Sequence, residues 1–429
     1  MSGRQTAPLA AWTADARDRT LAVLDELDDS QLDVPPYLPT VNPFRWEMGH
    51  VAWFQDHFVL QQGLGLDATD PAADKLYDSA AVGHERRWRQ EPESRTRVRG
   101  YVNAVCDRVL DALEAHEPTP ELRDLTLLAI FHADMHNEAS IYMRQALGLP
   151  APCSVEALPL ATTPTPDGDV VIAGGNFQLG AQDDDHFAFD NERSPHAVEL
   201  APFTIARLPV SQAELAAFAD DGGYQTQALW SRAGWSWRQA LSAEQPCYWR
   251  RNGGGGWLRR SFETWRPIEP ELPASHVSWY EADAWCRWAG RRLPSEAEWE
   301  VAADVSGSSG AASKRSHPWG EALPDSEFAN LDARVLGCAP RGAYPAGDTP
   351  EGCRQLWGNV WEWTASTFLP YPGFEVGVYA EYSEPWFGAR KVLRGGCWAT
   401  RSRMLRNSFR NFYTPDRRDV YAGFRTCAR

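Results

Sequence analysis

The sequence lacks any long apolar segment. No run approaches the roughly 18 uninterrupted apolar residues that a membrane-spanning helix needs. The first 19 residues, MSGRQTAPLAAWTADARDR, also lack the apolar core of a signal peptide. From these two absences we expect a soluble, cytoplasmic protein without a membrane partner.

Basic residues are fewer than acidic ones. Lys and Arg number 42 against 58 Asp and Glu, a net charge of −16. Because a nucleic-acid backbone favours clustered Lys and Arg, we expect no nucleic-acid partner.

The eight cysteines, at positions 106, 153, 247, 286, 338, 353, 397 and 427, form no C-x-x-C motif. In a cytosolic chain this indicates reduced, mostly buried thiols and no cysteine-ligated zinc.

Tryptophan, by contrast, is abundant. The chain has 20, most of them in its second half. Large rings fill irregular space in loop-rich domains, and aromatic faces also hold cationic ligands. A chain of 429 residues with 43% hydrophobic content has enough apolar material for two or three cores.

Residues 1–150 are predicted to be mainly helical. Apolar residues recur at helical spacing in four segments, 9–27, 44–60, 97–115 and 121–147. Pro43 precedes the second segment, as helix starts favour. Four such helices predict a bundle, in which metal sites are built from side chains on facing helices.

The fourth segment contains His132 and His136. Residues four apart lie on one face of a helix, with Cβ atoms about 5–6 Å apart. Two neutral imidazoles at this spacing suit a first-row divalent metal. Phe131, Met135 and Tyr142 indicate a mostly buried helix, where unpaired imidazoles are costly. The pair leaves such a site one protein ligand short.

His50 is a candidate for the third ligand. It lies within the second segment beside Val51, Trp53 and Phe54, and we expect it to face the other two histidines across the bundle. His57, two turns further along, is interpreted as a core or rim histidine. A carboxylate remains an alternative third ligand, and the candidates are Glu47, Asp56, Asp134 and Glu138.

The amino-acid composition of the chain changes after residue 150. Residues 151–169, rich in Pro, Thr and Ala, are predicted to be an interdomain linker. Residues 170–429 form a second domain with β-like runs at 170–172, 196–200 and 203–205 and short helices at 210–218, 278–290 and 294–303. Ser211 is expected to be an N-cap, and Ser295 opens a capping box with Glu298. The predicted fold class is α+β.

The second domain carries motifs of a known fold. They are Gly174-Gly175-Asn-Phe-Gln-Leu-Gly180, Phe189-Asp-Asn-Glu192-Arg-Ser-Pro195-His196, Gly290-Arg-Arg-Leu-Pro294-Ser, Leu356-Trp-Gly-Asn-Val-Trp-Glu362-Trp, Val392-Leu-Arg-Gly-Gly396-Cys-Trp and Gly423-Phe-Arg425. In this order they resemble the sulfatase-modifying, formylglycine-generating domain, a C-type-lectin-related fold. The cysteine pair that this family uses after Arg-Gly-Gly is missing from Trp398-Ala-Thr400-Arg-Ser-Arg-Met404-Leu405. Copper-dependent cysteine oxidation is therefore not expected.

Residues 1–150 are similar to the DinB-like four-helix bundle. The fusion of the two domains resembles the ergothioneine-biosynthesis sulfoxide synthases and selenoneine synthase, which are non-haem iron enzymes acting on hercynine. The resemblance implies Fe(II) as cofactor, with hercynine, a selenosugar or thiol donor, and O2 as substrates. The family's three iron-binding histidines match His50, in Trp46-Glu-Met-Gly-His50, and His132 with His136.

The substrate residues of the family match in part. Its Arg-Asn-Trp-Asp-like run appears as Arg410-Asn411-Phe412-Tyr413, so the resemblance implies that Asn411 and Phe412 hold the trimethylammonium group. The acidic position associated with γ-glutamylcysteine is Tyr413, and a glutamine of the metal helix is Met135. These departures weaken the case for γ-glutamylcysteine as donor, and the His-x-x-Met-His-x-Glu-Ala run of the metal helix resembles the selenosugar branch. The resemblance implies that Arg86, Arg87, Arg89 and Met135 bind the donor, and solvated loop charges are the alternative for the three arginines.

A tyrosine near the iron is needed to supply a proton or an electron. The candidates are Tyr379, Tyr382 and Tyr413. Hercynine's quaternary ammonium cannot donate a hydrogen bond, so aromatic faces such as that of Phe412 suit it. Three other functions are kept open: a sulfoxide synthase using cysteine or γ-glutamylcysteine, a non-catalytic ligand-binding module, and a zinc hydrolase or thiol transferase.

Overall fold

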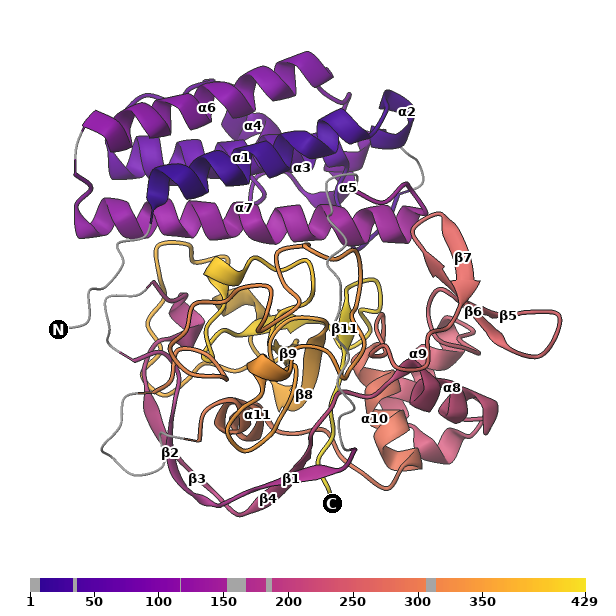
Figure 1. Ribbon diagram of the computed structural model, residues 1–429. Helices are drawn as coiled ribbons and strands as arrows, with labels where there is room; N and C mark the ends of the chain where they lie inside the picture. Colours follow the sequence, from indigo (N-terminus) through magenta and orange to yellow (C-terminus); the bar gives the residue numbers. More distant parts are fainter. Residues whose placement is uncertain (1–7, 34–36, 116, 153–166, 183–186, 306–313) are drawn as a thin grey trace. The chain divides into compact units, whose positions relative to one another are not determined.

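The computed structural model describes residues 8–33, 37–115, 117–152, 167–182, 187–305 and 314–429 (Figure 1). The chain separates into two compact units, an N-terminal unit of residues 1–153 and a C-terminal unit of residues 154–429. The predicted linker, 151–169, lies mostly outside the described residues. Its boundaries therefore stay a prediction.

The N-terminal unit is built on four long helices, shown in indigo to purple in Figure 1: α1 (Leu9–Glu26), α3 (Phe44–Gln55), α6 (Arg95–Ala115) and α7 (Pro120–Leu147). Both α1 and α3 pack against α6 and α7. This confirms the predicted bundle. The second helix differs from the prediction because, after α3, the chain continues as a π-helix, η1 (Asp56–Gly63). The described residues of the unit also form three short helices, which are α2 (Asp29–Leu32), α4 (Ala73–Tyr77) and α5 (His84–Arg89).

Helix α7 is fixed at both ends. The Thr119 hydroxyl accepts a hydrogen bond from the Leu122 amide, and Pro120 occupies the first turn. Gly148 ends the helix with a φ of 69°, a left-handed conformation that glycine adopts without strain. The 28-residue helix thus holds His132 and His136 rigidly in its middle.

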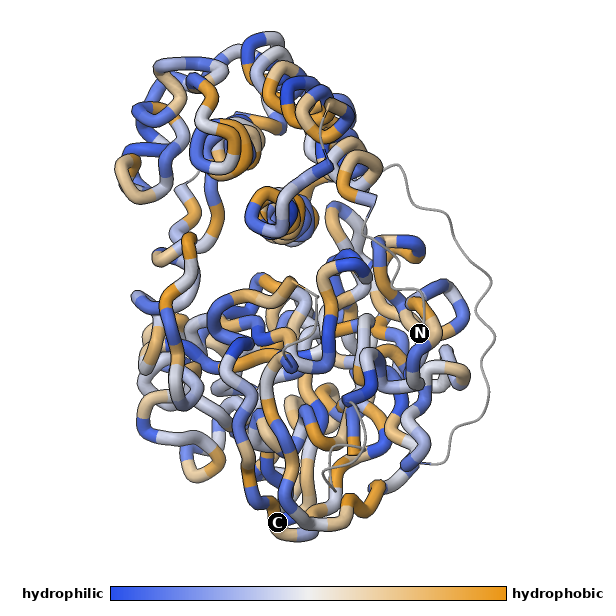
Figure 2. The backbone as a smooth tube through the Cα atoms, turned by 90° about the vertical axis from the view of Figure 1, so that its left-hand side faces the viewer, coloured by the Kyte–Doolittle hydropathy of each residue, from blue (hydrophilic) through white to orange (hydrophobic). Residues whose placement is uncertain are grey.

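Hydropathy along the helices follows the pattern of a bundle. Figure 2 shows hydrophobic and hydrophilic residues alternating along the helical tubes, as expected when one face of each helix is buried. Within the described ranges, none of the helices combines the length and the apolar composition that crossing a membrane requires.

The C-terminal unit has short strands in small sheets. Its largest sheet has the order β10-β9-β8-β11, with β11 parallel to β8 and the other pairs antiparallel. These strands are β8 (Trp361–Thr367), β9 (Lys391–Arg394), β10 (Asn411–Tyr413) and β11 (Ala422–Gly423). Two smaller sheets have two strands each: β1 (Asp169–Ile172) pairs with β4 (Phe203–Ala206), and β2 (Gly175–Leu179) pairs with β3 (His196–Leu200). A three-stranded sheet has the order β5 (Trp249–Arg251), β6 (Trp257–Ser261) and β7 (Thr264–Pro267).

Among the described residues, the α-helices that accompany these sheets are α8 (Gln212–Asp220), α9 (Arg232–Ala240), α10 (Trp279–Trp288) and α11 (Glu296–Ala303). The predicted caps are confirmed, because Ser211 and Ser295 each cap a helix and form a capping box with the residue three positions on. The α+β fold class and the three predicted strands are confirmed as well.

Large rings and paired arginines fill the core of this unit. The largest fully buried side chains include Trp299, Trp357, Trp361, Trp363 and Trp398. Short strands leave irregular space, which these rings occupy. Arg394 is fully buried and is neutralised by Glu296 and Glu300. Seven cysteines within the described ranges are free, and Cys153 lies outside them.

Candidate metal centre and substrate residues

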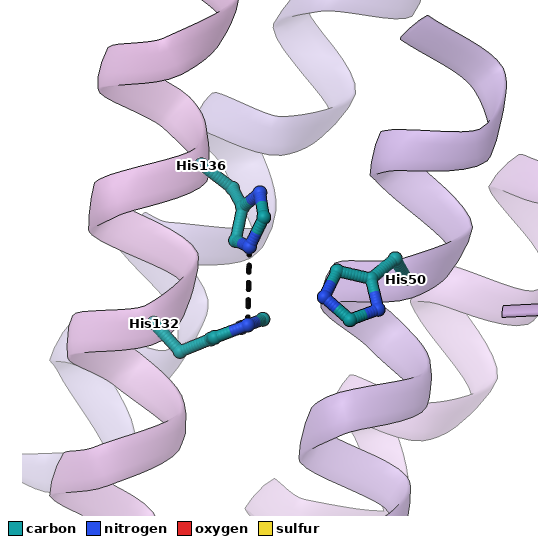
Figure 3. A group of neighbouring side chains, drawn as sticks. All are labelled: His50, His132 and His136. Atoms are coloured by element: carbon teal, nitrogen blue, oxygen red, sulfur yellow. Dashed lines mark hydrogen bonds between the residues drawn. The ribbon is translucent and has the colours of Figure 1, made fainter. Parts of the chain in front are cut away.

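The structure brings the three predicted histidines together. His50 projects from α3, while His132 and His136 lie one turn apart on α7 (Figure 3). One ring nitrogen of each lies within 4.8 Å of the others. The Nε2 atoms of His132 and His136 are 3.0 Å apart, and the His50 ring lies 5.0 Å from each of the other two ring centres.

This donor set fits a divalent transition metal. Two nitrogens that each lie about 2.1 Å from one metal at right angles are about 3.0 Å apart, which is the separation found between His132 and His136. Three imidazole nitrogens from one side leave the remaining octahedral positions open. The residues present therefore fit a first-row divalent metal, Fe(II) among them.

His50 is held by a backbone carbonyl and two indole rings. Its Nδ1 lies 2.8 Å from the carbonyl oxygen of Tyr77, which only accepts, so Nδ1 carries the proton and Nε2 keeps its lone pair. Trp46 and Trp53 both stack on the imidazole, with ring centroids 4.8 and 5.6 Å away. Burial, followed by the charge of His136, lowers the pKa of His50 to about 3. The ring is therefore neutral at pH 7, as a metal ligand must be.

His132 lies in a similarly apolar place. Its ring stacks on Phe54 with centroids 3.6 Å apart and planes 9° apart. Burial, then the neighbouring His136 and His50, lower the pKa of His132 well below its ordinary value. Both fully buried histidines are thus kept neutral by their surroundings.

His136 contacts a carboxylate through its other ring nitrogen. Its Nδ1 lies 2.7 Å from Glu47 Oε1, and Glu47 is 3% exposed. Burial raises the pKa of Glu47, but His136, His50 and a hydrogen bond from Asn42 outweigh it, so that the pKa is lowered. Sequence reasoning offered Glu47 only as a ligand. Glu47 lies three residues before His50 and therefore on the same helix face, but no sequence pattern pairs it with His136, 89 positions away.

The structure favours three histidines over a mixed site. In the part of the chain that is described, the candidate metal-binding group contains no carboxylate, so Asp134 and Glu138 stand outside it. The Asp56 carboxylate accepts hydrogen bonds from the Thr69 amide and hydroxyl. His57 is also outside the group and stacks on Trp53 at 5.3 Å.

The three candidate arginines lie on α5. Arg87 donates to the carbonyls of Val82 and Ser79 and lies over the Trp46 ring at 4.1 Å. Arg86 is exposed, and Arg89 is exposed and pairs with Glu85 at 3.1 Å. Met135 is half-buried on α7 beside His136. The roles of these residues in donor binding stay predictions.

The C-terminal candidates gather around strand β10. Phe412 stacks on Phe368 with ring centres 4.0 Å apart and contacts Tyr382 at 5.5 Å. The Asn411 side-chain oxygen accepts from the amide of Phe412. The two ring contacts join residues 44 and 30 positions apart into one aromatic cluster.

Tyrosines 379, 382 and 413 belong to the same neighbourhood. Tyr382 lies 5.9 Å from Tyr379, and Arg417 covers the Tyr413 ring at 4.8 Å. Burial, then the charges of Glu192 and Asp190, raise the pKa of Tyr382 well above its ordinary value. Its hydroxyl therefore keeps its proton at pH 7.

Comparison with known proteins gives matches over both units. The sulfatase-modifying factor enzyme 1-like domain family matches residues 155–429, and the DinB superfamily matches residues 13–139. The hercynine oxygenase of Mycolicibacterium thermoresistibile is 38% identical over 98% of this chain and 94% of its own length. That of Mycobacterium tuberculosis is 40% identical over 97% of each. The formylglycine-generating enzyme of Thermomonospora curvata is 32% identical over 61% of this chain and 93% of its own length.

The fold and the site therefore define a protein in which a DinB-type helical unit, with a three-histidine group, is fused to a sulfatase-modifying-type unit. The relatives that match nearly end to end narrow this class. The chain belongs to the hercynine oxygenase family, and the resemblance found in the sequence is confirmed.

Proposed function

We propose that this protein is an Fe(II)- and O2-dependent enzyme that joins a selenium or sulfur donor to a ring carbon of hercynine. The observation that carries the proposal is the buried three-histidine group. It stands in a chain that is 38–40% identical to relatives named hercynine oxygenase over nearly its whole length.

The reaction balances with one O2. A hydrogen is lost from the hercynine ring carbon and another from the donor chalcogen, and a carbon–chalcogen bond forms. One oxygen atom ends on the chalcogen as a sulfoxide or selenoxide, and the other leaves as water. O2 accepts four electrons in this exchange, two from bond formation and two from oxidation of the chalcogen. A bound Fe(II) supplies the one-electron chemistry with O2 that side chains alone do not provide.

The side chains have three tasks in this proposal. The imidazoles of His50, His132 and His136 hold the metal through their neutral nitrogens. The rings of Phe412 and Tyr382 offer aromatic faces to the quaternary ammonium group of hercynine, and Asn411 offers a dipolar side chain beside them. A tyrosine hydroxyl delivers a proton, and Tyr382 is the first candidate because its ring lies 5.5 Å from that of Phe412. Tyr379 and Tyr413 are the other candidates.

For the donor, we propose a selenosugar. The resemblance implies that Tyr413 and Met135 stand where family members that bind γ-glutamylcysteine have an acidic residue and a glutamine. A neutral selenosugar does not need that acidic partner. Arg86, Arg87 and Arg89 remain candidates for donor contacts.

A donor panel tests the proposal. Full-length protein, loaded anaerobically with Fe(II), is given hercynine, O2 and one donor at a time: a selenosugar, cysteine or γ-glutamylcysteine. We expect a product whose mass equals hercynine plus the selenosugar plus one oxygen minus two hydrogens. The corresponding product from a thiol alone would establish the sulfoxide synthase instead. Stoichiometric binding of hercynine without any product or any bound iron would establish a ligand-binding module.

A further inference from the structure

A row of hydrogen bonds leads to His136 within the N-terminal unit. Arg87 Nη1 donates to Asn42 Oδ1 over 2.9 Å, and Asn42 Nδ2 donates to Glu47 Oε2 over 2.8 Å. The other carboxylate oxygen, Glu47 Oε1, lies 2.7 Å from His136 Nδ1. Four side chains from three separate segments are thereby linked in one line.

The chemistry of the donors fixes the direction of every bond. A guanidinium only donates, so the amide of Asn42 must turn its oxygen to Arg87 and its NH2 to Glu47. A carboxylate that already accepts from Asn42 accepts from His136 as well, which places the imidazole proton on Nδ1. The Nε2 atom of His136, 3.0 Å from His132 Nε2, is then left with its lone pair. The hydrogen bonds that run from Arg87 through Asn42 and Glu47 therefore determine the tautomer of His136.

The surroundings hold this line in place. Arg87 is anchored by two more hydrogen bonds, to the carbonyls of Val82 and Ser79. Its guanidinium lies over Trp46, and Trp46 in turn stacks on His50. The same arginine thus supports one histidine of the group through hydrogen bonds and another through an aromatic ring.

We propose that Glu47 is a positioning residue that directs His136 Nε2 toward the metal, and that Asn42 and Arg87 hold Glu47 in the orientation this needs. The inference rests on the metal role proposed above for the three histidines. It gives Arg87 a task distinct from donor binding. Carboxylates that orient a metal-binding histidine in this way are commonly worth 10- to 100-fold in metal affinity.

The test measures metal binding by the full-length protein, using Fe(II) titration under anaerobic conditions and the visible absorption of Co(II). Glu47→Ala is expected to weaken Fe(II) binding about 10- to 100-fold. Glu47→Gln keeps the size of the side chain but sets an NH2 against the NH2 of Asn42, so a loss of about tenfold is expected. Asn42→Asp sets two carboxylates together and is expected to weaken binding as well.

The sharpest variant combines two of these changes. In Asn42→Asp with Glu47→Gln, residue 42 accepts from both Arg87 and the Gln amide, and the Gln oxygen accepts from His136, so every bond of the row is restored. We expect this double variant to recover most of the lost affinity and the wild-type Co(II) spectrum. No recovery would overturn the proposal, because a change in volume or charge alone predicts additive losses.

Arg87→Met separates the two roles of that residue. The proposal expects weaker Fe(II) binding in the absence of any donor, whereas a residue that only binds donor would leave metal affinity unchanged. The control is Asp56→Asn, which alters another fully buried carboxylate of the same unit, bonded to Thr69, and is expected to keep wild-type Fe(II) affinity. An equal loss in this control would overturn the proposal.

Failure of the inference and of the proposed function give different results. If wild-type protein takes up neither Fe(II) nor Co(II) at the histidines, the proposed metal role fails and the inference with it. If wild type binds metal and the Glu47 variants bind it with the same affinity and spectrum, the inference alone is wrong. Apo-protein circular dichroism of each variant identifies any loss of folding, and the size-matched Glu47→Gln decides the matter if Glu47→Ala unfolds.

Discussion

The ring of Tyr77 lies where a side chain on Gly49 would begin. A Cβ atom at position 49 would overlap the Tyr77 ring carbons. That ring is 3% exposed and stacks on Tyr101 at 5.8 Å, so it has no free space to enter. The carbonyl of the same tyrosine accepts from His50 Nδ1. The missing side chain of Gly49 therefore allows a distant segment to approach α3 and orient the next residue, His50.

Gly49→Ala is accordingly expected to damage both packing and metal binding. Overpacking at a buried contact costs about 1–3 kcal/mol, and displacement of the Tyr77 carbonyl is expected to weaken Fe(II) binding about tenfold. Urea unfolding and anaerobic Fe(II) titration measure the two effects. Gly100→Ala on α6 is the matched control. A Cβ there meets no atom within 4 Å, and this change is expected to stabilise by up to about 1 kcal/mol. Equal behaviour of the two variants would contradict the assignment.

His136→Ala is expected to abolish stoichiometric iron and turnover while the bundle stays folded. The loss in metal affinity should exceed about 100-fold, since changes behind a ligand already cost 10- to 100-fold. Metal analysis after anaerobic loading and gel filtration measures it, with circular dichroism as the folding check. His57→Ala, in the same unit but outside the group, is expected to keep its iron. A His136→Ala protein that retains iron would remove the basis of the proposed function.

Phe412→Leu tests the recognition of hercynine. Loss of a cation–π contact worth about 0.5–2 kcal/mol is expected to raise KM for hercynine about 2- to 30-fold with little change in kcat. Phe387→Leu is the control. Phe387 also packs on Phe368, but among the described residues its ring forms no pair with a ring of strand β10. Equal KM values in the two variants would argue against a substrate role for Phe412.

Tyr382→Phe tests the proton donor. The ring and its stacking on Phe189 at 4.5 Å are kept, and only the hydroxyl is lost. If Tyr382 delivers the proton, kcat is expected to fall about 10²- to 10⁴-fold with KM nearly unchanged. Steady-state kinetics of the Tyr379→Phe and Tyr413→Phe variants are the comparison. A full loss in one of these, with Tyr382→Phe active, would move the role to that residue.

His276 is expected to make the C-terminal unit sensitive to acid. Burial, against the opposing effect of Asp419, lowers its pKa from 6.5 to about 3. Between these values the unfolded chain binds a proton that the folded chain does not, so stability falls as pH decreases, by up to about 1.4 kcal/mol per pH unit. Urea unfolding between pH 7 and pH 4 is expected to show a shallower dependence for His276→Asn, a residue that tolerates the φ of 60° at this position. Parallel curves for the two proteins would rule this linkage out.

Much of the architecture is local and was therefore accessible from the sequence. Apolar residues at helical spacing fix where α1, α6 and α7 lie, and Ser211 and Ser295 mark helix starts through contacts three residues away. The spacing of His132 and His136 places them on one face of any helix. The resemblance to the DinB-like and sulfatase-modifying folds followed from runs of contiguous residues for the same reason.

The centre itself was decided by tertiary structure. Whether His50 meets the α7 histidines depends on the rotation of α3 against α7, which no local pattern specifies. The contact from Glu47 to His136 spans 89 positions and that from Arg87 to Asn42 spans 45, so neither appears in a sequence pattern. Local spacing along the chain shows which side chains are available and on which helix faces they stand. Only packing of the helices decided which nitrogen of each imidazole is protonated, because that depends on the acceptor each ring meets.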